Sequence, residues 1–105
     1  NNNMTIKNIV KELETAEKPV AKMLRKGDGF QVLAIGFKKD MILPKHTSSL
    51  PARLVVIKGE VVYNNEKGPN PLALYDEYEI PVDEHHWVTA SEDSIIMVIK
   101  GQLTQ

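Results

Sequence analysis

The residues of this sequence best suited to chemistry are its three histidines, His46, His85 and His86. Imidazole is the side chain that gains or loses a proton near neutral pH, and its nitrogens are common metal ligands. The adjacent pair follows an acidic turn that contains proline, and it opens into the run Trp87-Val88-Thr89, whose aromatic and β-branched residues favour a strand. A histidine at the start of a strand is held firmly enough to bind or to catalyse.

The third histidine stands in a similar setting. His46 follows a proline and a lysine, and a polar segment separates it from the strand-like run Arg53–Ile57. Successive side chains of a strand point to opposite faces, so only one of His85 and His86 can share a site with His46. We expect that one to be His86, with His85 facing solvent or a subunit contact. Two histidines anchored at turns are the constellation of this chain that could carry a site.

The elements that must position these histidines are mostly strands. Residues 5–18 carry apolar side chains at helical spacing and predict one short amphipathic helix, which Pro19 ends. The pattern after it predicts short strands separated by turns. These strands are Val20–Arg25, Phe30–Phe37, Met41–Leu43, Ala52–Lys58, Val61–Tyr63, Leu72–Leu74, Trp87–Ala90 and Ile95–Ile99.

The segments between the predicted strands are polar or contain proline. Pro44 is expected to stop the third strand, residues 64–71 to form a solvated turn region, and residues 75–79 to be an acidic run. Some eight to ten short strands after one helix indicate an all-β protein, an antiparallel sandwich or barrel. We expect one domain over residues 5–105, and we interpret residues 1–3 before Met4 as an expression remnant.

Composition excludes several classes of function. The chain has 13 basic and 14 acidic side chains, and this balance gives no general attraction for nucleic acid. It has no cysteine, so disulfides, thiolate metal sites and cysteine nucleophiles are absent. The longest apolar runs fall far short of the roughly 18 residues of a membrane helix. We therefore expect a cytoplasmic protein with neither nucleic acid nor membrane as a partner.

The order of these signals resembles the cupin family, whose first motif is written G-x5-H-x-H-x3,4-E-x6-G and whose second is G-x5-P-x-G-x2-H-x3-N. Residues 40–59 can be laid on the first motif and residues 75–90 on the second. Four positions match, namely His46, Gly59, Pro81 and His86. The resemblance implies a jelly-roll-like antiparallel β-barrel and covers most of the chain, from about Phe30 to Ile99.

Six motif positions depart from the family pattern. Asp40, Tyr75 and Asp83 stand where glycines are usual, and Ser48, Ala52 and Ala90 replace a histidine, a glutamate and an asparagine. The family's usual site holds a divalent transition metal (iron, manganese, nickel, copper or zinc) through three histidines and a glutamate. Here the resemblance leaves His46 and His86 as metal ligands. A third ligand would have to be His85 or a carboxylate of Asp76, Asp83 or Glu84.

Three interpretations of function follow. The first is a small cupin that binds a small molecule in its barrel through His46, Ser48, Tyr63 and His86. The second is a metal-dependent cupin enzyme, an oxygenase or isomerase, with an incomplete histidine site. The third is a structural homodimer, because cupins commonly pair through sheet edges. A further alternative stays open for His46 and His86, which could be structural residues bonded to Ser48, to Tyr63 or to the backbone.

Overall fold

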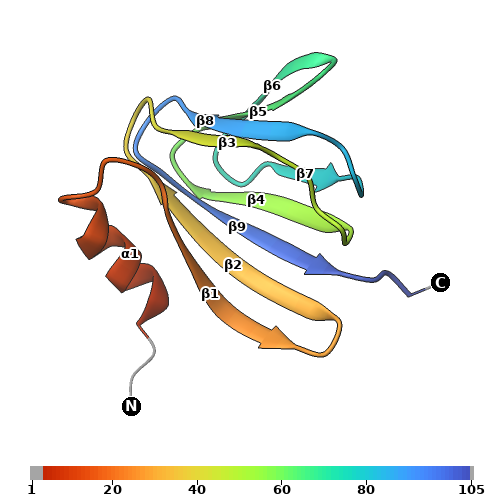
Figure 1. Cartoon of the computed structure of the whole chain (residues 1–105). Helices are drawn as coiled ribbons and strands as arrows, with labels where there is room; N and C mark the ends of the chain where they lie inside the picture. The colour runs from red at the N-terminus through yellow and green to blue at the C-terminus, as the bar shows by residue number, and fades with distance from the viewer. Residues whose placement is uncertain (1–3, 105) are drawn as a thin grey trace.

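Two antiparallel β-sheets face each other in this protein, whose structure is a computed structural model that describes residues 4–104. The lower sheet of Figure 1 has five strands in the order β1-β2-β9-β4-β7, and the upper sheet has four in the order β3-β8-β5-β6. The strands are β1 (Val20–Gly27), β2 (Phe30–Phe37), β3 (Ile42–His46), β4 (Ala52–Lys58), β5 (Val61–Asn65), β6 (Gly68–Leu72), β7 (Glu77–Ile80), β8 (His86–Ala90) and β9 (Ser94–Gly101).

The arrangement confirms the predicted all-β, cupin-type architecture. Nine strands and one helix lie within residues 4–104, in agreement with the expected eight to ten strands after a helix. Every described strand pair is antiparallel. Among the described residues no ladder of hydrogen bonds joins one sheet to the other, so the two layers enclose an interior without closing into a continuous barrel.

Two predictions were wrong around β6, and β7 was not among the predicted strands. Residues 68–72 pair with β5, although a solvated turn was expected there, and the strand predicted at residues 72–74 ends at Leu72. The prolines Pro69 and Pro71 are tolerated because β6 is the edge of its sheet, where an amide proton is dispensable. The acidic run is also partly strand, since Glu77 and Glu79 in β7 lie beside Arg53 and form ion pairs with it.

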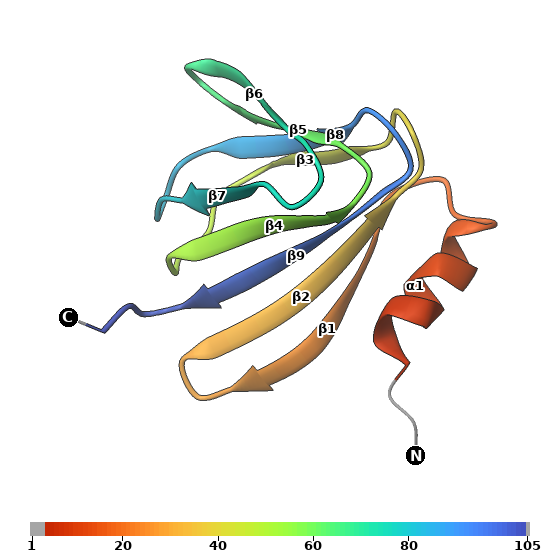
Figure 2. The ribbon, with the colours of Figure 1, turned by 180° about the vertical axis from the view of Figure 1, so that it is seen from behind.

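The helix α1 (Thr5–Leu13) is five residues shorter than predicted. It lies against the outer face of the five-stranded sheet beside β1 and β2, as the reverse view in Figure 2 shows. Ile9 is fully buried there, and Gly36 of β2 provides the space, because a Cβ at Gly36 would collide with Ile9 and Leu13. Leu13 is thus a packing residue, and the chain beyond it turns toward β1.

The hydrophobic core lies between the two sheets. Its members face inward from both layers, as strand alternation requires. They are Ile35, Phe37, Ala52, Leu54, Val56, Val61, Tyr63, Leu72, Ile80, Val88, Ala90, Ile96 and Val98. No helix within residues 4–104 has the length and hydrophobicity needed to cross a membrane. The residues interpreted as an expression remnant, 1–3, lie outside the described part of the chain.

Candidate functional site

An irregularity in β3 places His46 inside the molecule. Leu43 pairs with Val88 and His46 pairs with His86, so three steps along β3 face two steps along β8. Such a β-bulge inserts one extra residue and reverses the parity of the strand. Leu43 and His46 can therefore both face the interior. Pro44, which we expected to end the strand, lies in this bulge, where its missing amide proton costs no ladder hydrogen bond.

The two motif histidines are direct cross-strand neighbours. Residues opposite each other in an antiparallel pair project from the same face with their Cβ atoms about 5 Å apart. The imidazole centroids of His46 and His86 are accordingly 4.2 Å apart, with the rings inclined by 60°. His85 is exposed, as the alternation of the strand predicted. The sequence prediction that His46 and His86 converge inside the β-structure agrees with this geometry.

Backbone carbonyls fix the orientation of both rings. The Nδ1 atom of His46 lies 2.8 Å from the Pro44 carbonyl oxygen, and Nδ1 of His86 lies 2.9 Å from that of Glu84. A carbonyl oxygen can only accept, so each Nδ1 carries a proton and donates. In the neutral ring Nε2 is then left as an acceptor. The backbone contacts expected of structural histidines are present, and they leave one nitrogen of each ring available to a ligand.

The surroundings of His86 favour its neutral form. The side chain is only 3% exposed, and this burial is the main cause that lowers its pKa below the ordinary value. Electrostatic interactions with His46 and Lys100 lower the pKa further, while the contact with Glu84 opposes the change. At neutral pH His86 consequently presents a hydrogen-bond acceptor at Nε2.

Tyr63 packs against His86 on the side away from the cavity. Its ring stacks on His86 with the centroids 5.2 Å apart, and it is fully buried without lining the cavity. Its hydroxyl donates to Glu84 Oε2 over 2.7 Å, and Asn65 Nδ2 donates to the other carboxylate oxygen over 3.3 Å. Burial, helped by Glu84, raises the pKa of Tyr63, so the hydroxyl keeps its proton. Tyr63, which we predicted to bind ligand, contacts His86 and Glu84 from this position, and its role in ligand binding stays a prediction.

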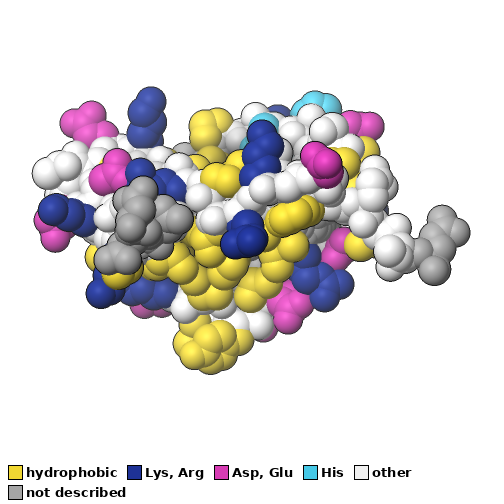
Figure 3. Space-filling view, turned by 90° about the horizontal axis from the view of Figure 1, so that it is seen from below, with side chains coloured by type: hydrophobic (Ala, Val, Ile, Leu, Met, Phe, Trp, Pro, Cys, Tyr) yellow, Lys and Arg dark blue, Asp and Glu magenta, His cyan; other side chains and the backbone are white. Residues whose placement is uncertain are grey.

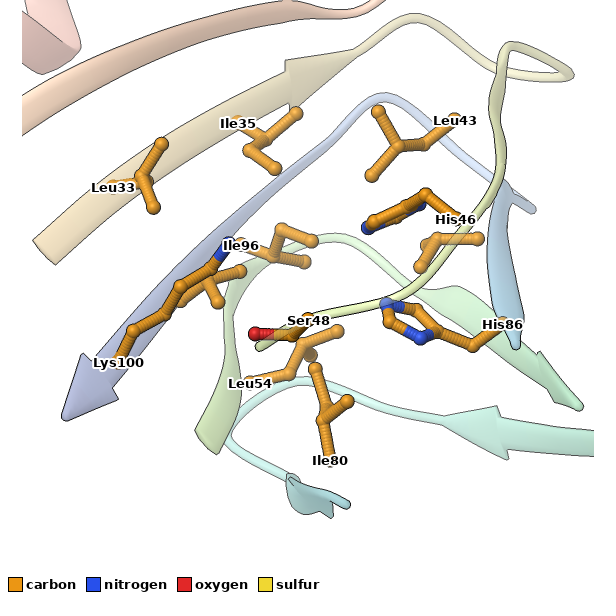
Figure 4. A pocket seen from close by; sticks show the side chains of 12 residues that line it. Leu33, Ile35, Leu43, His46, Ser48, Leu54, Ile80, His86, Ile96 and Lys100 are labelled. Atoms are coloured by element: carbon orange, nitrogen blue, oxygen red, sulfur yellow. The ribbon is translucent and has the colours of Figure 1, made fainter. Parts of the chain in front are cut away.

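A small cavity of about 60 Å³ opens beside the two imidazoles (Figure 4). Its walls are aliphatic side chains from both sheets, interrupted by four polar residues. The aliphatic residues are Leu33, Ile35, Leu43, Leu54, Ile80, Val88, Ile96 and Val98, and the polar ones are His46, Ser48, His86 and Lys100. Since a water molecule occupies roughly 30 Å³ in the liquid, the cavity suits a ligand of only a few non-hydrogen atoms.

Ser48 belongs to the cavity wall as predicted, but its hydroxyl proton is already engaged. Ser48 Oγ donates to the Leu50 carbonyl oxygen over 2.8 Å, which leaves the hydroxyl oxygen as an acceptor. The backbone carbonyl of Ser48 in turn accepts from the Asp83 amide at 2.9 Å. This bond connects the segment after His46 with the turn before His86.

Lys100 is the site residue that the sequence reasoning missed. The run Ile95–Ile99 was read as a wholly apolar strand, whereas β9 continues to Gly101. Ile96, Val98 and Lys100 share one parity, and all three line the cavity. The signal was present as a lysine two residues beyond two inward-facing aliphatic residues.

The side chains at the cavity do not fit a typical transition-metal site. Within residues 4–104 no three histidine or acidic side chains come together around one point. Of the predicted third ligands, His85 and Asp83 are exposed, Glu84 is bound by Tyr63 and Asn65, and Asp76 accepts from the Ala73 amide. Two imidazoles fall short of the three protein ligands usual for catalytic zinc or oxygenase iron.

The backbone nevertheless follows the motifs at their glycine positions. Within residues 4–104, three residues other than glycine have positive φ angles, Asp40 at 73°, Tyr75 at 71° and Asp83 at 63°, and all three replace motif glycines. The retained Gly59 has a φ of 76°. The left-handed turns are thus kept where the residue that adopts them most easily has been replaced.

Comparison with known proteins finds similarity in structure alone. No family model and no curated protein matches the sequence. Among solved structures, an RmlC-like cupin protein from Desulfovibrio desulfuricans is 20% identical with a TM-score of 0.76, and the match covers 81% of this chain and 83% of that one. An RmlC-like cupin family protein with a double-stranded β-helix fold from Methanocaldococcus jannaschii is 21% identical, with a TM-score of 0.73 and 84% of each chain covered.

An uncharacterized protein with a double-stranded β-helix domain from Klebsiella pneumoniae gives a similar result. It is 16% identical with a TM-score of 0.77, and the match covers 88% of this chain and 85% of that one. At such identities the likeness concerns the course of the backbone. The chain has the cupin fold.

Proposed function

We propose that this protein binds a small molecule in the cavity between its two sheets, with His46 and His86 as the recognition residues. The observation that carries the proposal is a pair of imidazoles that line the cavity and are held through their Nδ1 atoms by backbone carbonyls. The Nε2 atom of each neutral ring is then left to accept a hydrogen bond from a ligand. A neutral imidazole accepts from an O–H or N–H group. The ligand therefore carries at least one hydrogen-bond donor. The aliphatic walls can bury a short hydrocarbon part of the same molecule.

Titration with three small donors tests this proposal. The probes are lactate, lactamide and 1,2-propanediol, each followed by the methyl resonances of the cavity residues Leu54, Val88 and Ile96. We expect saturable shifts with at least one probe, weakened about tenfold in His86→Leu, which loses one acceptor. His85→Leu changes the adjacent exposed residue and should leave the affinity unaltered. If no probe gives saturable shifts at these methyl groups, the proposal fails.

A metal-dependent activity is the alternative that the same histidines raise. Elemental analysis of gently purified protein distinguishes the two, because a resident metal would be found near one equivalent per chain. It would be lost in both His46→Ala and His86→Ala. That result would show that the imidazoles bind a metal, and it would contradict their proposed role in recognising a small molecule.

The homodimer stays a prediction. The outer face of the five-stranded sheet carries the exposed apolar side chains of Phe30 and Ile99, which line a shallow groove together with Leu103 beyond the end of β9. Figure 3 shows hydrophobic side chains gathered on this side of the molecule. Light scattering at low protein concentration measures the mass directly, and a monomer would contradict the prediction.

A further inference from the structure

Lys100 brings a positive charge into a cavity that is otherwise lined by aliphatic side chains, two imidazoles and Ser48. It stands on the inward parity of β9 after Ile96 and Val98, opposite Ala52 of β4. Its side chain extends over the cavity in Figure 4. Its ammonium group also acts on the pKa of His86, which it helps to lower. The charge of Lys100 is therefore felt at the imidazole pair.

No carboxylate balances this charge among the residues that the structure describes. The ion pairs within residues 4–104 join Lys22 with Glu12, Lys45 with Glu66, and Arg53 with Glu77 and Glu79. None of the described residues that line the cavity is acidic. Glu84 is the acidic residue nearest in the chain to His86, and its two oxygens are occupied by Tyr63 and Asn65. An ammonium group beside aliphatic walls without a counter-charge favours an anion in the cavity.

The size and walls of the cavity select the kind of anion. A cavity of about 60 Å³ favours a ligand of few non-hydrogen atoms over a nucleotide or a sugar phosphate. Aliphatic walls favour an anion with a short hydrocarbon part, which a carboxylic acid has and an inorganic anion lacks. A planar carboxylate also accepts from an ammonium group in a charge-assisted hydrogen bond.

We propose that the ligand of this cavity is a small aliphatic carboxylate, whose carboxylate group binds Lys100 while its hydrocarbon part packs against the aliphatic walls. This inference rests on the proposed small-molecule function and adds to it the charge of the ligand and the residue that recognises it. Hydroxyl recognition by the histidines and carboxylate recognition by Lys100 are separate contacts, so separate variants test them.

The test compares lactate with lactamide, which has nearly the same shape and no charge. We expect the wild-type protein to bind lactate about tenfold more tightly, as a charge-assisted contact predicts. Lys100→Met keeps the aliphatic stem and removes the ammonium group, and it should abolish the preference. Lys26→Met provides the matched control, because Lys26 is an exposed lysine of β1 that does not line the cavity. Lys100→Gln repeats the measurement if the methionine variant does not fold.

The outcomes separate the two proposals. Equal affinities for lactate and lactamide in the wild-type protein would overturn the carboxylate inference and leave small-molecule binding intact. A preference for lactate that persists in both Lys100 variants would overturn the role of Lys100, and with it the inference. If neither lactate nor any neutral probe binds, the proposed function and this inference fail together.

Discussion

The interior between the two sheets has a closed end and an open end, and the same strands form both. At the closed end, residues such as Phe37, Val56 and Val61 are at most 1% exposed and do not line the cavity. The open end contains His86 of β8 and Lys100 of β9. His86 continues the inward-facing series of Ala90 and Val88 in β8. Along each strand every second side chain still faces the interior, but these side chains change from aliphatic to polar toward the open end. We infer that stability resides mainly at the closed end and binding at the open end.

The largest effect that tests this division is expected from Phe37→Ala. Phe37 is fully buried at the closed end, so its truncation removes a large apolar contact and leaves a void. We expect the free energy of unfolding in urea to fall by about 3–5 kcal/mol. The comparison variant is Lys100→Met at the open end, which should change this free energy by less than about 0.5 kcal/mol. Similar losses in the two variants would remove the distinction between the ends.

A smaller effect is expected behind the imidazoles, where Tyr63→Phe removes the hydroxyl that donates to Glu84. Loss of a hydrogen bond to a charged group predicts a decrease of about 2 kcal/mol in the free energy of unfolding. Tyr78→Phe is the matched control. The Tyr78 hydroxyl accepts from Asn65 Nδ2 over 3.5 Å, the limit for such a contact, and its removal should cost less than about 0.5 kcal/mol. Equal losses would show that Tyr63 acts through ring packing alone.

The alternation of apolar and polar residues, together with the turn residues, was sufficient to predict most strands. It was insufficient where the position of a side chain depends on the register between two strands. The strands at residues 30–37 and 52–58 have the predicted bounds because their β-branched and apolar residues match buried strands. The position of His46 depends on a bulge in β3, and the extra residue of a bulge leaves no mark in local propensity. His46 and His86 could be proposed as partners, but their direct pairing is a property of two strands taken together.

The departures from the cupin motifs have two different physical meanings. Asp40, Tyr75 and Asp83 replace glycines and keep the left-handed backbone, so the turns of the fold survive at a cost of roughly 1–2 kcal/mol each. Ser48 and Ala52 replace ligands of the family's metal site, and no backbone geometry can restore the missing donor atoms. This difference explains why the sequence could predict the fold, whereas the ligands and chemistry of the site stay predictions. Lys100 was left out of the predicted site because the predicted strand ended at Ile99, although alternation places it on the face of Ile96 and Val98.

The smallest expected effect concerns the protonation of His86 at the open end. Because its pKa is lowered in the folded protein, the unfolded chain binds the proton more readily below about pH 6.5, the ordinary value. Acidification through this range therefore removes stability, which is fully present above it. We expect the free energy of unfolding to fall between about pH 7.5 and about pH 5.5 by more in the wild-type protein than in His86→Gln. Titration of the His86 imidazole resonance by NMR, assigned with the same variant, gives the folded pKa directly. A midpoint at or above the ordinary value would contradict the prediction, because burial beside Lys100 and His46 would then not disfavour the charged ring.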